Sequence, residues 1–287
     1  MTKEKAIVLM HITALLWGVA GVIGASISVH STVLTTGRSI FALIFLVLWH
    51  GASKIYEVLK LKKTELGILL LTGLFLGVHW IFFFLSIAKG SVAIALVTYA
   101  TSPVIIALGE IALGWSKPKP IVVFAAILSC IGIFVIHPIF TLEDLINLGF
   151  VYGMLSAASI CVMALIGKSL LSRNVDAIAL TIGQLVGACI VSLPLSLSHF
   201  SGSISTRDLG LIVALGLFCS AIGQSLFNRA LVVISVSTGS IVASMEAPYG
   251  VVLAFILIGE KLTLGVVAGV LLVTISAILV SLPRQSD

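Results

Sequence analysis

The sequence predicts an all-α membrane protein with ten transmembrane helices, arranged as two inverted five-helix repeats with both termini in the cytoplasm. Three observations lead to this prediction: an apolar composition, ten apolar stretches of membrane-spanning length, and a hydrophobic pattern that occurs twice. An inverted pair of repeats is typical of secondary transporters.

The composition excludes an ordinary soluble domain. The chain has 287 residues, of which 60% are hydrophobic and 9% are charged, and its mean hydropathy is +1.27. A soluble domain carries about 25% charged residues. We therefore expect the chain to lie in a lipid bilayer.

Apolar stretches of about 18 to 25 residues, the length that crosses roughly 30 Å of hydrocarbon, recur between short polar breaks. They predict transmembrane helices at residues 6–28, 33–51, 66–87, 91–115, 119–137, 149–169, 176–197, 209–231, 237–257 and 264–282. The strands of a transmembrane barrel would instead be alternating segments of about ten residues. No break between the predicted helices is long enough for a soluble domain.

The hydrophobic pattern of the third and fourth predicted helices returns in the eighth and ninth. The matching positions are Gly73–Phe75 with Gly216–Phe218, Pro103 with Pro248, and Gly114 with Gly259. The sequence thus divides into residues 1–143 and 144–287, each with five helices. Because five is an odd number, the second repeat enters the membrane from the side opposite to the first, and the repeats are inverted.

The basic residues favour one side of the membrane. If the N-terminus is cytoplasmic, the outer loops hold only Lys89, Arg207 and Lys261, and Arg38 lies within a helix. The cytoplasmic loops, tails and helix ends hold Lys3, Lys5, Lys54, Lys60, Lys62, Lys63, Lys117, Lys119, Lys168, Arg173, Arg229 and Arg284. This excess follows the positive-inside rule and predicts cytoplasmic termini.

Pro103 and Pro248 stand at matching places within the fourth and ninth predicted helices. Each removes a backbone hydrogen bond and is expected to bend its helix. Bent helices at equivalent places of two repeats indicate a central binding site.

Four G-x-x-x-G pairs place two glycines on one helix face, which lets helix backbones approach closely. These pairs are Gly73/Gly77, Gly149/Gly153, Gly183/Gly187 and Gly265/Gly269. They serve packing within the bundle, or one of them, with Gly265/Gly269 as the best candidate, forms a dimer interface. Both a monomer and a weak homodimer are consistent with the sequence.

Several short motifs stand in a fixed order along nearly the whole chain. They are Trp17-Gly18 in the first predicted helix, Arg38 in the second, Ser102-Pro103 in the fourth, and Glu246-Ala247-Pro248 followed by Gly259-Glu260-Lys261. In this order they resemble the ten-helix drug/metabolite transporter superfamily, and within it the EamA-like branch. The first repeat departs from the pattern, because it ends in Gly114-Trp115 where the family often has Gly-Glu. The resemblance implies a multi-pass carrier of the cell membrane, frequently an exporter of amino acids or other small metabolites, that works by alternating access.

Four ionisable residues stand out within predicted helices, where a charge costs about 2.5 to 3.5 kcal/mol and so marks a candidate site: Glu246, Arg38, Glu110 and His79. Glu246, beside Pro248, is a candidate for proton coupling, or it is paired permanently with Arg38. Arg38 is then either the partner of Glu246 or the group that holds a substrate carboxylate. Glu110 either lines an inner vestibule or pairs with Lys117.

Aromatic and amide side chains complete the candidate substrate site. His79 is a candidate for the cavity because histidine changes charge near neutral pH. The aromatic residues that follow it are also typical of a helix that faces lipid or packs against other helices. Gln224 and Asn228 are four residues apart and share a helix face, where they contact a cargo or link helices. An aromatic ring near a carboxylate holds an ammonium group by cation–π attraction, which favours a zwitterionic or cationic cargo. The expected substrate-binding set is Trp17, His79, Trp80, Tyr99, Gln224, Asn228 and Glu246.

The functional hypothesis is a secondary transporter of a small polar metabolite, either coupled to protons through Glu246 and His79 or working as an uncoupled facilitator. The alternative is an intramembrane enzyme, but the sequence contains no H-E-x-x-H or G-x-S-x-G motif and no ATP-binding P-loop. The four cysteines lack metal-ligand spacing, so no metal or cofactor is expected. The net charge of +5 lies at the membrane edges and does not indicate nucleic-acid binding.

Overall fold

The computed structural model describes residues 1–90, 92–99, 101–115, 119–136, 148–200, 202–258 and 263–281, and within them the secondary structure is helical. The first half contains α1 (Lys3–Ala25), α2 (Ser31–His50), α3 (Ala52–Leu59), α4 (Lys63–Lys89), α5 (Val92–Tyr99), α6 (Ser102–Ala112) and α7 (Pro120–Ile136). The second half contains α9 (Leu148–Leu171), α10 (Ala177–His199), α11 (Thr206–Ala214), the π-helix η1 (Leu215–Gly223), α12 (Gln224–Leu231), α13 (Val236–Ala243), α14 (Glu246–Ile258) and α15 (Leu264–Ser281). The predicted boundary at Glu143 and Asp144 lies outside the described residues.

Seven of these helical segments are long and apolar enough to cross a membrane. They are Lys3–Gly24, Ser31–His50, Lys63–Lys89, Leu148–Leu171, Ala177–His199, Thr206–Leu231 and Leu264–Ser281. The other three predicted spans coincide with α5 and α6, with α7, and with α13 and α14, all of them shorter helices. The all-α membrane fold is therefore confirmed, while the number of ten crossings stays a prediction.

The fourth and ninth predicted spans are interrupted rather than bent. Pro103 is the second residue of α6 and Pro248 is the third residue of α14. Proline fits the first turn of a helix, where its missing N–H has no intrahelical acceptor, but it disrupts a helix interior. Each span consequently ends before its proline and restarts as a second helix.

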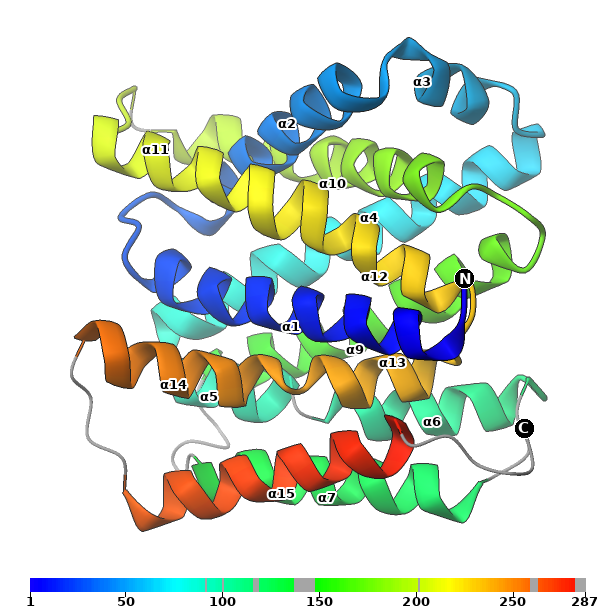
Figure 1. The fold of residues 1–287 in the computed structure, drawn as a ribbon. Helices are drawn as coiled ribbons and strands as arrows, with labels where there is room; N and C mark the ends of the chain where they lie inside the picture. The colour runs from blue at the N-terminus through cyan, green and yellow to red at the C-terminus, as the bar shows by residue number, and fades with distance from the viewer. Residues whose placement is uncertain are drawn as a thin grey trace.

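The contacts between helices follow a pseudo-two-fold relation between the halves (Figure 1). The α4–α9 contact corresponds to the contact of α1 with η1 and α12, and α10–α4 corresponds to α2–η1. The pairs α2–α10 and α7–α15 each join a helix to its own counterpart, and α7 and α15 lie together at one edge of the bundle (Figure 1). This is the arrangement expected of two inverted repeats.

Glycines allow a close helix crossing between α4 and α10. A Cβ atom at Gly73 would lie 2.5 Å from the Gln184 carbonyl oxygen and 2.7 Å from Gly187 Cα. The G-x-x-x-G pair that was the dimer candidate also packs within the chain, because a Cβ at Gly132 of α7 would lie 2.9 Å from the Gly269 carbonyl oxygen. Small residues thus bring backbones together inside the bundle.

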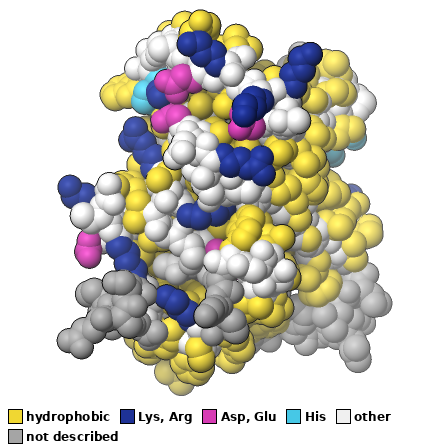
Figure 2. All heavy atoms as spheres, turned by 90° about the vertical axis from the view of Figure 1, so that its right-hand side faces the viewer, with side chains coloured by type: hydrophobic (Ala, Val, Ile, Leu, Met, Phe, Trp, Pro, Cys, Tyr) yellow, Lys and Arg dark blue, Asp and Glu magenta, His cyan; other side chains and the backbone are white. Residues whose placement is uncertain are grey.

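The two faces at the helix ends differ in charge. The helix α1 begins and α15 ends on the same side of the molecule (Figure 1). Lysine and arginine side chains gather on this side (Figure 2), which we call the basic face. It includes the exposed Lys5, Lys60, Lys62, Lys63 and Arg173, whereas Lys89 and Arg207 lie at the other ends of their helices, on the opposite face. The positive-inside rule predicts that the basic face is cytoplasmic.

A short helix that the sequence analysis did not predict, α3, crosses the basic face. Its Lys54 ammonium group lies 2.9 Å from the Glu57 carboxylate and 3.2 Å from Asp176, which caps α10. The hydrogen bond to Glu57 raises the pKa of Lys54. The helix escaped prediction because its polar residues interrupt the apolar pattern.

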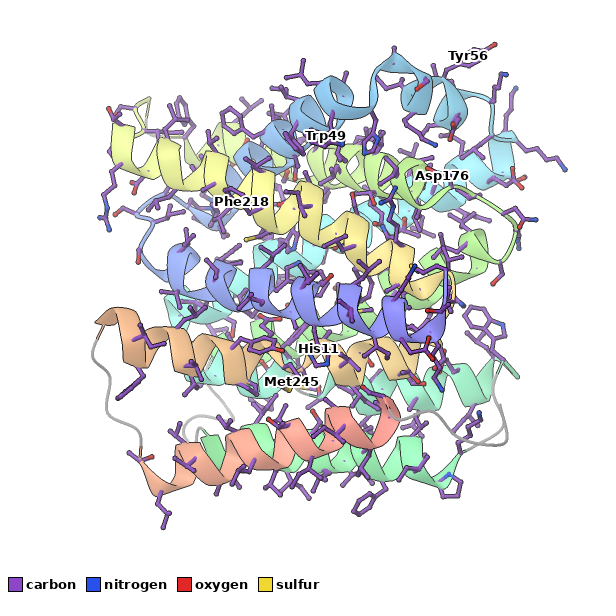
Figure 3. All side chains as sticks on the ribbon, viewed as in Figure 1. His11, Trp49, Tyr56, Asp176, Phe218 and Met245 are labelled. Carbon is purple, nitrogen blue, oxygen red and sulfur yellow. The ribbon has the colours of Figure 1, made fainter. Side chains whose placement is uncertain are left out.

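Apolar side chains cover the lateral surface of the bundle. Trp49 is 72% exposed and Phe218 is 49% exposed, and Figure 3 labels both. His11 lies between α1 and α14, where its Nδ1 atom is 2.9 Å from the Tyr249 hydroxyl group (Figure 3). Exposed apolar side chains around the bundle are expected for a protein in lipid.

We predict that Gly73→Ala destabilises the protein by about 1 to 3 kcal/mol, because the new methyl group overpacks the α4–α10 crossing. The matched control is Gly67→Ala in the same helix, where a Cβ atom meets nothing within 4 Å. Thermal unfolding of the purified proteins in detergent measures the melting temperatures of both variants. Equal melting temperatures for the two variants would contradict this view of the crossing.

Candidate functional site

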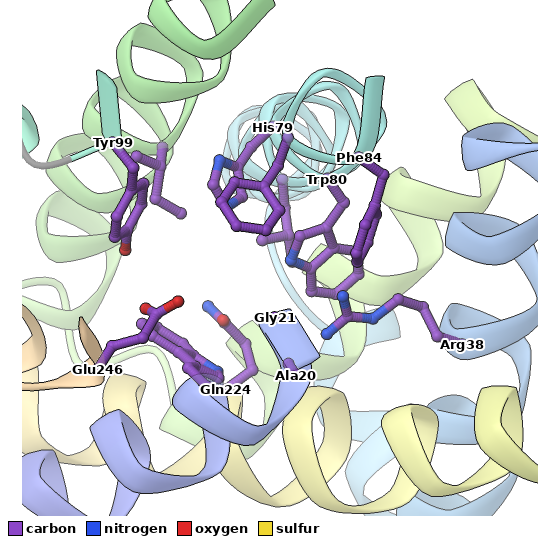
Figure 4. A pocket seen from close by; sticks show the side chains of 13 residues that line it. Ala20, Gly21, Arg38, His79, Trp80, Phe84, Tyr99, Gln224 and Glu246 are labelled. Carbon is purple, nitrogen blue, oxygen red and sulfur yellow. The ribbon is translucent and has the colours of Figure 1, made fainter. Parts of the chain in front are cut away.

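A central cavity lies between the two halves, and helices of both halves contribute to its wall (Figure 4). The lining residues are Trp17, Ala20, Gly21, Arg38, Leu76, His79, Trp80, Phe83, Phe84, Tyr99, Ile160, Gln224 and Glu246. The cavity is narrow, with a volume of about 40 Å³. This is room for a few water molecules. Only a small ligand fits without a movement of the helices.

Glu246 stands at the start of α14 and directs its carboxylate into the cavity (Figure 4). The close approach of α1 shields it, since a Cβ atom at Gly18 would lie 2.8 Å from the Glu246 carbonyl oxygen. The side chain is 9% exposed, and within the described residues its carboxylate has neither a hydrogen-bond partner nor an ion-pair partner. The helix N-terminus favours the negative charge, but the carboxylate oxygens remain open to a ligand.

Arg38 lies on the other side of the cavity (Figure 4). Its Nε atom donates a hydrogen bond to Ser220 Oγ at 2.8 Å, and its guanidinium carbon lies 4.1 Å from the centre of the Trp80 ring. The residue is 3% exposed, and its two terminal nitrogens have no acceptor among the described residues. The guanidinium group can therefore donate hydrogen bonds to a ligand.

Of the two alternatives for Glu246, the ion pair with Arg38 is not formed in this structure, because no nitrogen–oxygen contact between them lies within 4.0 Å. The physical reason is that Ser220 and the Trp80 ring hold the guanidinium group away from α14. Two opposite charges consequently face one cavity without neutralising each other by direct contact.

The π-helix η1 positions Ser220 and was not predicted. Ser220 Oγ donates to the carbonyl oxygen of Leu215, five residues earlier, at 3.2 Å. The wider turn also offers the Cys219 carbonyl oxygen to Trp17 Nε1 at 3.1 Å. Such π-helical turns are frequent at functional sites. The largely apolar sequence of η1 does not distinguish it from an α-helix.

His79 and Tyr99 form the wall opposite Gln224. The His79 Nδ1 atom lies 2.8 Å from Ser156 Oγ and 3.1 Å from the Ser156 carbonyl oxygen, so α9 holds the imidazole ring. The ring centres of His79 and Tyr99 are 5.7 Å apart. The Tyr99 hydroxyl group points toward Glu246 and has no hydrogen-bond partner among the described residues (Figure 4).

The aromatic residues after His79 have mixed positions. Phe83 and Phe84 line the cavity, whereas Phe82 stacks on Tyr152 with ring centres 5.6 Å apart. Consecutive residues of a helix point in different directions, so these neighbours of α4 have different surroundings. The sequence alone does not show which of them faces the cavity.

The predicted amide pair is divided between two roles. Gln224 lines the cavity, but Asn228 does not. Asn228 Nδ2 donates to Gln184 Oε1 at 2.8 Å and to Thr181 Oγ1 at 2.9 Å, and Gln224 Nε2 donates to Gln184 Oε1 at 3.1 Å. Asn228 thus links α12 to α10, the second of the two roles that its spacing allowed.

Glu110 lies away from the central cavity. Its carboxylate accepts hydrogen bonds from the N–H groups of Val236 and Ser237 at the start of α13. The proposed partner Lys117 lies outside the described residues, as does the motif Gly259-Glu260-Lys261. Within the described ranges, no group of three or more His, Cys, Asp or Glu side chains is placed to hold a metal ion.

A family model, the EamA-like transporter family, matches residues 4–137 and again residues 147–282. The chain belongs to the EamA-like transporter family. The two matches confirm the two repeats, and with the apolar helices they establish a multi-pass membrane protein that is a transporter.

A curated relative of this EamA-like protein is the "Uncharacterized transporter YxxF" of Bacillus subtilis (strain 168). It is 25% identical over 288 residues, which cover 99% of this chain and 91% of that protein. A protein known from a crystal structure has the same fold, with a TM-score of 0.81 at 16% identity over 97% of this chain and 98% of that one.

We predict that Gln184→Leu destabilises this EamA-like protein by about 1 to 3 kcal/mol, because two buried amide groups lose their shared acceptor. Asn228→Leu removes one of the same hydrogen bonds. The sum of the stability losses of the two single variants should therefore exceed the stability loss of the double variant. Thermal unfolding of the four proteins measures this coupling. Strictly additive losses would show that the amide groups do not form a network.

Proposed function

We propose that this transporter moves a small zwitterion, an amino acid or a related amine, across the cell membrane by alternating access. The observation that carries the proposal is the pair of opposite charges, Glu246 and Arg38, that face one cavity without forming an ion pair. The cargo would bind between them, with its ammonium group at Glu246 and its carboxylate at Arg38.

The energetic argument rests on burial. A buried charge without a partner is costly, and a partner with good geometry offsets that cost. Glu246 is 9% exposed and Arg38 is 3% exposed. A zwitterion supplies a partner to each of them at once, whereas a singly charged cargo leaves one of them unpaired.

The side chains around the two charges fit the same cargo. The Tyr99 ring and hydroxyl group stand beside Glu246 (Figure 4), where an aromatic face attracts an ammonium group. The Trp80 ring orients the guanidinium group of Arg38, and a guanidinium group binds a carboxylate through two parallel hydrogen bonds. The narrow cavity favours an amino acid with a small side chain.

Proton coupling and export belong to the proposal. Glu246 would exchange a proton for the ammonium group of the cargo, and His79 is the second titratable group of the cavity. The resemblance to exporters favours outward transport. Inverted repeats permit two conformations, one open to each side of the membrane.

An organic anion is the second candidate cargo. The observation that favours it is the free donor capacity of Arg38, which Glu246 does not occupy. Such a cargo would bind Arg38 and depend little on the charge of Glu246, which makes the two proposals separable.

We predict that one class of amino acids or amines raises the melting temperature of the purified protein, because a ligand that binds the folded state stabilises it by mass action. Glu246→Gln and Arg38→Gln should each abolish this shift while the protein still folds. The control Glu57→Gln, on the basic face, should retain it. The assay screens amino acids, amines, nucleosides and organic acids by thermal unfolding.

Two outcomes would count against a zwitterionic cargo. A response to organic anions alone that survives in Glu246→Gln would assign the site to Arg38. Transport by Glu246→Gln in proteoliposomes with a normal pH dependence would remove Glu246 from proton coupling.

A further inference from the structure

Glu110 joins the two halves of the protein near the basic face. It lies in the last turn of α6, in the first half, and is 3% exposed. Its carboxylate accepts hydrogen bonds from the Val236 N–H at 2.7 Å, the Ser237 N–H at 3.3 Å and the Ser237 hydroxyl group. All three donors belong to the start of α13, in the second half.

Glu110 is not the only side chain that caps the start of α13. Ser235 Oγ already accepts a hydrogen bond from the Thr238 N–H at 3.2 Å, which is the usual role of an N-cap serine. Glu110 takes the two preceding N–H groups and places its charge at the helix N-terminus, where it is favoured. The contact therefore serves the connection between α6 and α13 in addition to helix capping.

The packed pair of α6 and α13 separates two cavities. The central cavity contacts Tyr99, just before α6, and Glu246, just after α13. A second cavity contacts the opposite ends of the same helices, at Glu110 and Ser235, and its wall includes Trp115, Lys168 and Arg173. The helices contact each other along the interval between the cavities. Together they stand between the central cavity and the second cavity.

The inverted repeat provides no equivalent charge on the opposite face. The register that matches Pro103 with Pro248 places Phe255 opposite Glu110. Phe255 is apolar and 47% exposed. Among the residues that the structure describes, the hydrogen-bonded connection between a broken helix of one half and its counterpart therefore occurs at the basic face.

We infer that Glu110 is a gate residue: its contact with the start of α13 holds the transport path closed at the basic face and must break for the path to open there. The inference rests on alternating access but does not depend on the cargo. Lys168 supports the closed state, because its Nζ donates to the carbonyl oxygens of Leu231 and Ile234, directly before α13.

The buried thiol of Cys161 reports on this gate. Cys161 is 2% exposed in α9, and its Sγ atom lies 3.6 Å from the Ser102 carbonyl oxygen at the start of α6. Separation of α6 from α13 and α9 would expose the thiol. The reporter protein carries Cys130→Ser, Cys189→Ser and Cys219→Ser, and the measured quantity is the rate of Cys161 modification by N-ethylmaleimide without any cargo.

We expect Glu110→Gln to raise this rate roughly tenfold or more, because it weakens hydrogen bonds to a charged acceptor. Ser237→Ala removes only the hydroxyl donor and should give a smaller increase, and it tests the gate even if Glu110→Gln does not fold. The matched control is Glu65→Gln. Glu65 accepts a hydrogen bond from the Lys62 N–H, so it caps its own helix on the basic face without joining the halves.

A second reporter separates gating from general loosening. In a protein that keeps Cys219 as its sole cysteine, Glu110→Gln should leave the modification rate unchanged or lower it, because Cys219 lies in η1 beside α1. Unchanged Cys161 rates in both Glu110→Gln and Ser237→Ala would overturn the inference. Equal increases at Cys161 and Cys219 would overturn it as well. Because no cargo is present, failure of the zwitterion proposal would leave these rates unaffected.

Discussion

The site depends on the need of every backbone N–H and C=O group for a partner within the bilayer. A continuous helix meets this need alone, but Pro103 and Pro248 interrupt two helices within the predicted membrane region. Elsewhere in the bundle, side chains bind backbone groups of other helices: Glu110 accepts hydrogen bonds from N–H groups at the start of α13, and Trp17 donates to a carbonyl oxygen of η1. The breaks before α6 and before α14 border the central cavity, because Tyr99 and Glu246 line it.

Most of the buried polar groups in this interior satisfy one another. Gln184, Gln224 and Asn228 share one network, and Ser156 fixes His79. Among the described residues, the hydroxyl groups of Ser31, Thr35, Ser129 and Ser225 are buried without a partner. The Glu246 carboxylate and the terminal nitrogens of Arg38 differ from them, because they carry charge and border the central cavity. A buried polar group without a partner requires an explanation, and a ligand that transiently provides the partner is the explanation that agrees with a transporter fold.

The sequence was sufficient to predict the membrane fold and the two repeats, because composition and helix length act locally. It predicted a bend near each proline, where the structure has a break between two helices. It also singled out Glu246 and Arg38, since charges are rare in apolar helices. It did not predict that Ser220 and Trp80 separate Arg38 from Glu246, because this depends on the π-helix and on the crossing of three helices. Asn228 shares a helix face with Gln224, yet the helix rotation that directs it toward α10 is a property of the packed bundle.

Inverted repeats alone would make the two faces equivalent and the two open states similar in energy. The sequences of the repeats are not identical, however, and each difference biases the equilibrium by its differential interaction with the two states. Glu110 and Phe255 are such a difference: a carboxylate bound to three donors stands at the basic face, and an exposed phenyl ring takes its place at the other. Contacts of this kind favour closure of the basic face when the cavity is empty. Cargo that reaches the cavity from the basic face would then have to supply, through Glu246 and Arg38, the binding free energy that compensates for opening the gate.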